Sequence, residues 1–255
     1  NWRRFDQWQI IIDFNHITKQ QVLKTSESKF LRIDLKTKEQ KIAYIMGAGD
    51  EVPNSLEQMG YKVTLLNPEE ISPEKLANFD VVMTGVRAYN TVQDLVNKKN
   101  ILFDFVKGGK TMLVQYNTSS DLVTENIAPY PLKLSSDRVT EENAEVRFIA
   151  PNHPVLNSPN KINAKDFEGW KQEQGLYYPR EFDKAFTPII SSNDKGESPK
   201  NGALLVAQYG KGFYIYTGLS FFRELPEGVS GAYKLLSNVI SLQSPVTIPA
   251  AKVKQ

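Results

Sequence analysis

Short apolar runs alternate with helical patterns of apolar residues between positions 41 and 91. The runs cover residues 42–46, 63–66 and 81–84. Between the first two runs, apolar side chains recur at helical spacing from Val52 to Met59, and Gly60 ends the pattern. Short buried strands that alternate with amphipathic helices are typical of a parallel sheet with both faces covered. The sequence therefore predicts an α/β fold built around this segment.

The rest of the chain extends this sheet. The pattern predicts a helix over residues 95–106, ended by Gly108 and Gly109, and a fourth strand at 111–115. Residues 203–209 and 213–217 are separated by Gly210-Lys211-Gly212 and predict a β-hairpin near the C-terminus. Apolar residues at helical spacing over 232–240 predict a closing helix. The expected architecture is three layers with a mainly parallel sheet and a C-terminal hairpin.

Two segments depart from the alternating pattern. Residues 1–40 form a lead-in with expected strands at 9–14 and 30–35 and a turn at 25–28, and we expect it to belong partly to a preceding domain. The segment from about residue 129 to 200 is rich in proline and aromatic residues. This composition predicts a lobe inserted into the α/β domain of residues 41–244. Residues 245–255 are expected to form a loose tail. Because the chain lacks an initiator methionine, we expect a processed or excised part of a longer protein.

The composition limits the chemistry. The 255 residues include no cysteine and two histidines, His16 and His153. Disulfides, thiolate metal ligands and a cysteine nucleophile are therefore excluded, and a histidine metal site is severely limited. We expect neither a cofactor nor a metal. The formal net charge of +2 gives no reason to expect a nucleic acid partner, and no apolar run approaches the roughly 20 residues that span a bilayer.

Ligands of parallel sheets bind beyond the carboxyl ends of the strands, so the loops after the predicted strands carry the candidate site. The loop Gly47-Ala48-Gly49 resembles the start of a dinucleotide fingerprint, but Val52 stands where the third glycine belongs. We instead expect Gly47, Gly49 and Gly85 to permit close backbone approach at a cleft.

Two further strand-end loops are rich in hydrogen-bonding side chains. After the third strand stand Arg87, Tyr89 and Asn90, and after the fourth stand Gln115, Tyr116 and Asn117. Arginine offers a rigid fork to an anion, and tyrosine offers a ring face with a polar tip. At the rim of a cleft such residues are suited to a polar ligand. The alternative is that Arg87 is a structural tether that binds loop carbonyls.

The inserted lobe and the last loop complete the candidate set with Trp170, Glu173 and Arg223. In the stretch DFEGWKQEQGLYY, aromatic residues are interleaved with amides and carboxylates. This composition suits carbohydrate, whose apolar ring faces stack on aromatics while its hydroxyls form hydrogen bonds. Two alternatives remain: the aromatics form the core of the lobe, and Arg223 pairs with an acidic residue such as Glu224.

Two hydrolytic arrangements also stay open. Glu168 and Glu173 are candidates for the carboxylate pair of glycoside chemistry. Ser119 or Ser120 with His153 is the set that serine hydrolysis would require. The sequence gives no separation for either set, so no residue is assigned as catalytic.

A wider set of motifs resembles a known family. They are IMGAGDEVPNSLEQMGY, DVVMTGVRAYNT, LVQYN, TENIAPYPLKLSSDRVT, HPVLNSPN, DFEGWKQEQGLYYP and LLVAQYGKGFYIYTGLSFFRELPEGVSGAY. Across residues 10–242 the chain resembles the C-terminal class I glutamine amidotransferase-like domain of large bacterial PIG-L (LmbE-related) N-acetylglucosaminyl-deacetylase-like proteins. The resemblance implies a flavodoxin-like core. It also implies an exported, periplasmic or cell-surface parent protein with a zinc-dependent deacetylase domain upstream, whose Ala-His-Pro-Asp-Asp type motif does not occur in this chain.

The chain departs from the family at the catalytic positions. The family's nucleophilic cysteine follows the strand that corresponds to 111–115, where this chain has Tyr116-Asn117. Its histidine and glutamate follow the strand that corresponds to 213–217, where this chain has Gly218-Leu219-Ser220-Phe221. Glutamine hydrolysis by that mechanism is therefore excluded.

The resemblance and its departures together give a functional expectation. We expect a non-catalytic accessory domain that binds carbohydrate, or that packs against the deacetylase domain and shapes its cleft. The alternatives are a hydrolase with an unfamiliar site built from Glu168, Glu173, His153 or Tyr116, and a purely structural interdomain module.

Overall fold

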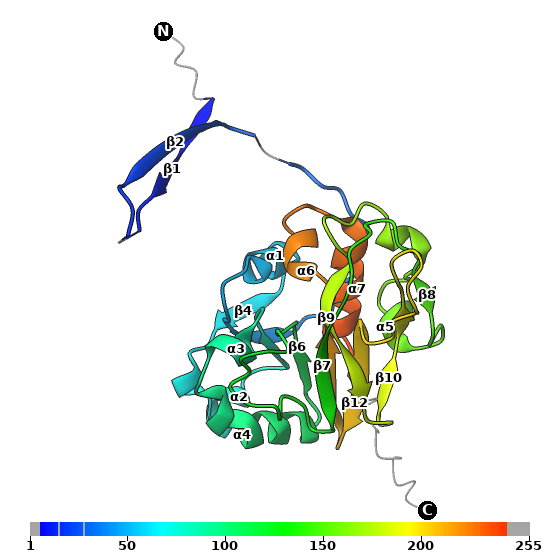
Figure 1. Cartoon of the computed structure of the whole chain (residues 1–255). Helices are drawn as coiled ribbons and strands as arrows, with labels where there is room; N and C mark the ends of the chain where they lie inside the picture. The colour runs from blue at the N-terminus through cyan, green and yellow to red at the C-terminus, as the bar shows by residue number, and fades with distance from the viewer. Residues whose placement is uncertain (1–5, 15, 28, 244–255) are drawn as a thin grey trace, which may run out of the picture. The chain divides into compact units, whose positions relative to one another are not determined.

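The structure is a computed structural model that describes residues 6–14, 16–27 and 29–243 (Figure 1). The chain divides into two compact units, Asn1–Ile33 and Asp34–Gln255. The tail predicted at residues 245–255 lies outside the described residues. That the lead-in of residues 1–40 belongs partly to another domain stays a prediction.

The first unit contains a β-hairpin. Strand β1 (Gln7–Ile12) pairs antiparallel with β2 (Gln20–Thr25), and Ile10 lies opposite Val22. The first strand matches the expectation, but the second does not. Residues 30–35 have no regular structure, because their alternating pattern finds no neighbouring strand to pair with, and the connection of the hairpin precedes Gln20 instead of lying at 25–28.

The second unit is organised around a seven-stranded sheet with the order β10-β12-β13-β6-β5-β3-β4. The strands β13, β6, β5, β3 and β4 run parallel, and β12 pairs antiparallel with both β13 and β10. This confirms the predicted parallel sheet, its extension by the C-terminal hairpin and the flavodoxin-like α/β class. The strand bounds are β3 Lys41–Ile45, β4 Lys62–Leu65, β5 Val81–Thr84, β6 Thr111–Val114, β10 Phe186–Pro188, β12 Leu204–Tyr209 and β13 Gly212–Thr217.

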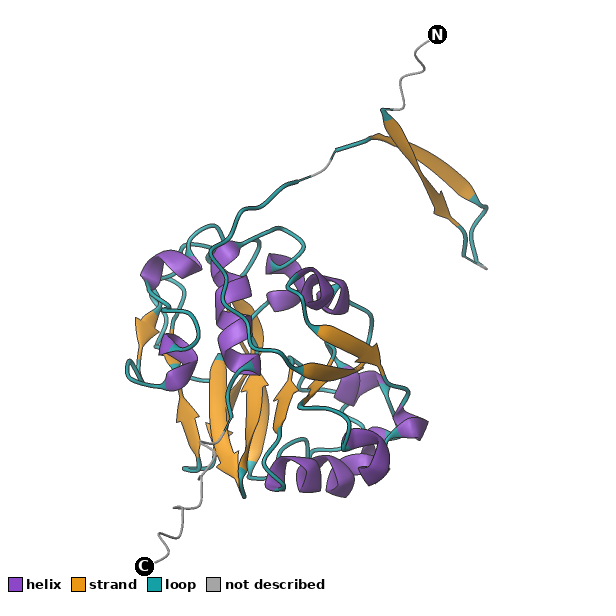
Figure 2. Ribbon diagram, turned by 180° about the vertical axis from the view of Figure 1, so that it is seen from behind, coloured by secondary structure: helices purple, strands orange, loops and turns teal. Residues whose placement is uncertain are grey.

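Helices cover both faces of the sheet (Figure 2). Successive strand residues point to opposite faces, and Ala43, Val82 and Met112 form one apolar cluster with Leu102 and Val106 of α4. Helix α7 packs against β6, and α1 packs against β4. The helices are α1 Val52–Gln58, η1 Pro68–Glu70, α2 Pro73–Leu76, α3 Ala88–Thr91, α4 Leu95–Lys107, α6 Phe221–Glu224 and α7 Ser230–Ile240. Among the described residues, no helix has the length and apolar character needed to cross a membrane.

The region predicted as a lobe is built from small ladders and single helical turns. Strand β7 (Leu132–Val139), which the sequence pattern did not predict, pairs antiparallel with β9 (Gly175–Phe182), with irregular register. Strand β8 (Arg147–Phe148) pairs with β11 (Ile190–Ser191), and the turns are α5 (Pro154–Asn157) and η2 (Ala164–Phe167). Because β10 joins the main sheet beside β12, the last part of this region is continuous with the α/β core.

Candidate functional site

The loops that follow the parallel strands converge. Ala48 N donates to Val86 O at 2.9 Å, which joins the loop after β3 to the loop after β5. Arg87 N donates to Tyr116 O at 2.8 Å, which joins the loop after β5 to the loop after β6. The ring of Phe222, in α6, lies 5.3 Å from the ring of Tyr116 between centroids. The four strand-end segments therefore form one site, as expected from the common direction of the strands.

The inner part of this site is a hydrogen-bond network of Tyr44, Asp50, Gln115 and Asn117, here called the inner network. The Tyr44 hydroxyl donates to Asp50 Oδ1 at 2.7 Å and lies 2.7 Å from the donating Gln115 Nε2. Asp50 also accepts from the backbone N–H groups of Val52 and Val86, at 3.0 and 3.1 Å. Burial, reinforced by the Asp50 carboxylate, raises the pKa of Tyr44. Most of these polar groups bind one another or the loop backbone, while the buried Gln115 Oε1 has no hydrogen-bond partner among the described residues.

Asn117 and Asn90 hold neighbouring loops together in the same way. Asn117 is fully buried, accepts from Tyr89 N at 2.8 Å and donates to Gln115 O at 2.9 Å. Asn90 Nδ2 donates to Ser120 O at 2.9 Å, and its Oδ1 accepts from Thr118 N at the same distance. Gln115, Asn117 and Asn90, predicted as ligand contacts, therefore bind the protein's own backbone in this structure.

The glycines permit close packing, but protein atoms occupy the space beside two of them. A side-chain carbon on Gly47 would lie 2.2 Å from Val86 O, and one on Gly85 would lie 2.9 Å from Asp50 Oδ2. Gly47 and Gly85 therefore permit one loop to pack closely against another loop. Gly49 differs, since it has a φ of +104° and no neighbouring atom where a side chain would begin.

Two aromatic residues predicted as ligand platforms are buried. Tyr89 is fully buried, and burial raises the pKa of its hydroxyl. Trp170 is 1% exposed, its ring stacks 5.5 Å from that of Phe167, and its Nε1 donates to Asp166 O at 3.0 Å. Neither ring is exposed to a ligand in this structure. For Trp170, the packing matches the alternative that the aromatics form the core of the lobe.

The outer part of the site is a row of planar groups, here called the outer ladder, of Arg138, Tyr177, Tyr116, Phe222 and Arg223. The rings of Tyr116 and Tyr177 are stacked, with centroids 6.0 Å apart and planes 10° from parallel. The guanidinium carbon of Arg138 lies 5.8 Å from the Tyr177 ring centre, and that of Arg223 lies 4.9 Å from the Phe222 ring centre. Both tyrosines and Phe222 are half-buried, so the ladder reaches the surface.

Two cations and one carboxylate, Arg87, Arg223 and Glu173, act on the middle of the ladder. Burial raises the pKa of the Tyr116 phenol, while the nearby cations Arg87 and Arg223 act in the opposite direction. Arg223 forms an ion pair with Glu173, so its charge is compensated. The Tyr116 hydroxyl therefore remains a protonated donor beside cationic groups near neutral pH.

Beneath the ladder lies a fully buried carboxyl group, that of Glu224. Lys171 N donates to both of its oxygens, at 3.2 and 3.0 Å, and the Ser220 hydroxyl lies 3.2 Å from Oε1. Burial raises the pKa of Glu224 to about 7. This pairing joins α6 to the segment that carries Glu173. The expected pairing of Arg223 with an acidic residue is confirmed, with Glu173 as the partner in place of Glu224.

Arg87 occupies a distinct position beside the outer ladder. Its side chain is exposed, and its backbone is left-handed, with φ 57° and ψ 25°. No hydrogen bond or ion pair of the Arg87 side chain occurs within the described part of the chain, so the predicted tether to loop carbonyls is absent. Tyr177 has a positive φ of 54° as well. Two non-glycine residues with positive φ therefore flank Tyr116.

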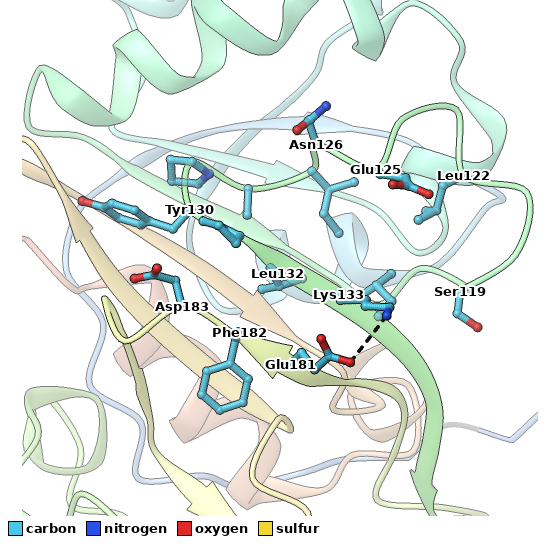
Figure 3. A pocket seen from close by; sticks show the side chains of 15 residues that line it. Ser119, Leu122, Glu125, Asn126, Tyr130, Leu132, Lys133, Glu181, Phe182 and Asp183 are labelled. Atoms are coloured by element: carbon cyan, nitrogen blue, oxygen red, sulfur yellow. Dashed lines mark hydrogen bonds and ion pairs between the residues drawn. The ribbon is translucent and has the colours of Figure 1, made fainter.

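Grooves adjoin the site on the lobe. One, of about 730 Å³, is lined by residues within 119–134 together with Glu181, Phe182 and Asp183, and its lining includes an ion pair between Lys133 and Glu181 (Figure 3). Its wall includes apolar side chains such as Leu122 and Leu132. A second, of about 550 Å³, is strongly charged and includes Arg138 of the outer ladder in its lining.

The structure gives no support to the hydrolytic arrangements. His153 Nδ1 accepts from Val155 N at 3.2 Å, which caps α5, and burial lowers the pKa of this histidine. In the described residues no hydrogen bond links His153 to Ser119, Ser120 or a carboxylate. Glu168 is exposed, while Glu173 is buried and paired with Arg223. Nor does any group of three histidine, aspartate or glutamate side chains gather as metal ligands among the residues described.

Two ladder residues were not among the expected contacts: Arg138 and Phe222. Phe222 directly precedes the predicted Arg223, whereas Tyr177 belongs to the aromatic stretch DFEGWKQEQGLYY, which was expected to suit carbohydrate. Arg138 lies on β7, a strand that was not predicted, and reaches the ladder only through the pairing of β7 with β9.

Comparisons with known proteins bear on the fold. No protein-family model matches the chain, and no curated protein matches its sequence. Its structure is similar to that of a putative ThuA-like protein from Bacteroides uniformis, with a TM-score of 0.53, 12% identity, and coverage of 84% of this chain and 97% of that one. It is also similar to the cytoplasmic protein STM3548 from Salmonella typhimurium, with a TM-score of 0.52, 11% identity, and coverage of 94% and 97%.

A third similar structure is the cytoplasmic protein STM1381 from Salmonella typhimurium LT2, with a TM-score of 0.50, 15% identity, and coverage of 92% of this chain and 95% of that one. At these identities the likeness shows the fold alone. The chain has the class I glutamine amidotransferase-like fold that ThuA-like proteins share. The comparisons contain no evidence for the PIG-L part of the resemblance.

Proposed function

We propose that this chain is a non-catalytic, amidotransferase-like module that binds carbohydrate at the outer ladder. The observation that carries the proposal is the stacked, half-exposed pair of Tyr116 and Tyr177 at the carboxyl ends of the parallel strands. Ligands of such sheets bind at this edge. Phenol hydroxyls and guanidinium groups around aromatic rings offer hydrogen bonds to sugar hydroxyls and apolar contact to sugar C–H groups.

No residue at this site takes the place of the cysteine nucleophile, or of the histidine and glutamate, that the resemblance implies. Tyr116 stands in the turn where the resemblance puts the nucleophilic cysteine, and a phenol held protonated by burial is a poor nucleophile. Ser220 and Glu224 follow β13, but both are fully buried, so a substrate has no access to them. A binding role needs neither a nucleophile nor a base.

The association with a deacetylase domain is part of the same proposal. It rests on the motif resemblance, in which the module packs against the deacetylase domain and shapes its cleft. A purely structural interdomain module is the second candidate. It is favoured by the inner network and Trp170, because six of the expected contact residues bind or pack against the protein itself: Tyr89, Asn90, Gln115, Asn117, Trp170 and Glu173.

Calorimetric titration of the full chain with chitin oligosaccharides and peptidoglycan fragments tests the proposal. Tyr116→Phe removes one hydrogen bond and should weaken binding by about 1 kcal/mol, whereas Tyr116→Ala should weaken it further. Tyr209→Ala is the matched control. Tyr209 is also a half-buried tyrosine, but it lies at the carboxyl end of β12, and because β12 runs antiparallel to β13, this end is at the sheet edge opposite the site. If no glycan binds, or if both alanine variants behave alike, the structural-module proposal is the one that stands.

A further inference from the structure

Arg87 is a cation that forms no ion pair with any described residue, and its backbone conformation is costly. A non-glycine residue is less stable in the left-handed region than in the right-handed one, because its Cβ crowds the following carbonyl oxygen. Two residues earlier the chain uses Gly85, yet the left-handed position itself carries an arginine. Backbone strain of this kind persists where the surroundings fix it, and it is concentrated at functional sites.

The surroundings of Arg87 fix its position. Its own N–H donates to Tyr116 O at 2.8 Å, and the next two residues are held by Gly85 O and by the Asn117 side chain. On the other side, Gly47 packs so closely against residues 86–88 that a side chain there would collide with the backbone. These contacts hold the backbone from which the exposed Arg87 side chain extends, although its guanidinium binds nothing in the described chain.

The charges around the ladder are not balanced. Glu173 compensates Arg223, but Arg138 forms no ion pair within the part of the chain described, and its guanidinium lies over the ring of Tyr177. Arg87 acts electrostatically on Tyr116 from the other direction. Two uncompensated guanidinium groups therefore accompany two tyrosines, and every polar side-chain group among these four residues donates hydrogen bonds in its protonated state. A donor-rich surface with excess positive charge fits a ligand that is rich in acceptors and negatively charged.

We propose that the ligand of this site is an anionic sugar, a saccharide that carries a carboxylate, and that Arg87 is the fork that binds this carboxylate. The inference rests on the proposed carbohydrate-binding function and adds the chemical class of the ligand. The guanidinium matches a carboxylate through two parallel N–H···O bonds, a geometry that lysine does not reproduce. The tyrosine hydroxyls contact the neighbouring sugar oxygens.

A matched pair of ligands tests this class directly. Trigalacturonate and its fully methyl-esterified form have the same sugar skeleton and differ in charge, and chitotriose serves as a neutral third ligand. We expect the full chain to bind the acid at least about tenfold more tightly than the ester. The preference should shrink as the salt concentration rises, because exposed charges are screened.

Variants of Arg87 separate binding from folding. Arg87→Gly removes the guanidinium and relieves the left-handed strain, so it should abolish the preference for the acid while the melting temperature stays equal or rises. Arg87→Lys keeps the charge without the fork and should retain only part of the preference. Arg147→Gln is the control, because it also removes one positive charge but lies in β8.

The outcomes distinguish the inference from the function on which it rests. Equal affinity for acid and ester, unaffected by Arg87→Gly, overturns the anionic class and leaves carbohydrate binding intact. Inorganic phosphate that binds as tightly as trigalacturonate also overturns it, since the sugar then adds nothing. If none of the three saccharides binds, the carbohydrate function fails together with the inference. A lower melting temperature of Arg87→Gly, with unchanged binding, would make Arg87 a structural residue.

Discussion

The inner network and the outer ladder meet in the loop after β6, which carries Gln115, Tyr116 and Asn117, but they use their polar residues differently. Asp50 accepts three hydrogen bonds, from Tyr44, Val52 and Val86, and is enclosed by the loops that it joins. Arg87, one residue beyond Val86, has an exposed side chain that binds no described residue. The difference shows that polar side chains at strand ends serve two purposes: most satisfy the loop backbone, and a few are left for a ligand.

The division also has a physical basis. Loops at a sheet edge carry many backbone N–H and C=O groups that the strands cannot satisfy. The short side chains of Asn117 and Asp50 accept hydrogen bonds from backbone N–H groups of these loops. Long side chains such as Arg87 and Arg223 extend past the loop and reach the surface. We expect substitutions in the inner part to change stability and those in the outer part to change binding.

The largest expected effect is that of Trp170→Ala. This side chain is 1% exposed and packs between Phe167 and Phe221, so its removal leaves a large cavity and an unpaired Asp166 carbonyl. The free energy of unfolding should fall by about 3–5 kcal/mol, measured by chemical denaturation. A loss below about 1 kcal/mol would show that Trp170 is not a core residue, and Trp170 would again be a candidate for stacking on a ligand. Tyr177→Ala is the comparison, and should cost less because Tyr177 is half-buried.

Glu224 should make the stability depend on pH. Its folded pKa of about 7 lies above the ordinary value of 4.5, because burial disfavours the carboxylate. Its favourable contribution is therefore complete below about pH 4.5 and is lost as the pH rises through about 7. Relative to Glu224→Gln, the wild type should lose up to about 3 kcal/mol between pH 4.5 and pH 8.5. Parallel stability curves for the two proteins would contradict this assignment.

Asp50→Ala should have the third largest effect on the free energy of unfolding. The substitution leaves the Tyr44 hydroxyl and two backbone N–H groups without their acceptor, which should lower the free energy of unfolding by about 2–3 kcal/mol. Asp50→Asn retains one carboxamide oxygen and should recover part of the loss. Amide hydrogen exchange at Val86 provides a local measurement, and unchanged protection there in Asp50→Ala would count against the network.

The smallest expected effect on stability is that of Arg87→Gly. Relief of the left-handed strain should raise the free energy of unfolding by up to about 1 kcal/mol, offset in part by the flexibility of glycine in the unfolded chain. Arg87→Ala keeps the strain and should be close to neutral. A decrease of more than about 1 kcal/mol in both variants would show that the guanidinium stabilises the fold and would erase the contrast between the two parts of the site.

Local patterns in the sequence were sufficient for the sheet. The apolar runs at 42–46, 63–66, 81–84 and 111–115 became the parallel strands β3, β4, β5 and β6, each within a residue of its expected bounds. Buried parallel strands need continuous apolar side chains, so the signal is contained in each run by itself. Once the strands are parallel, the meeting of their terminal loops follows from topology. The failure at 30–35 has the same origin, because an alternating pattern specifies a strand only where a partner exists.

Only the tertiary structure decided which of the loop residues face inward. Tyr89 and Tyr116 are both tyrosines in segments that follow parallel strands, yet Tyr89 is fully buried in α3 and Tyr116 is half-buried in the outer ladder. Their orientation depends on the left-handed turn at Arg87 and on the approach of Gly47, which are interactions between segments about 40 residues apart in the chain. Residue types and spacing thus determined the fold and the edge at which the site lies. Packing between distant segments determined which side chains remain free to bind, because burial and hydrogen-bond satisfaction are properties of the assembled loops.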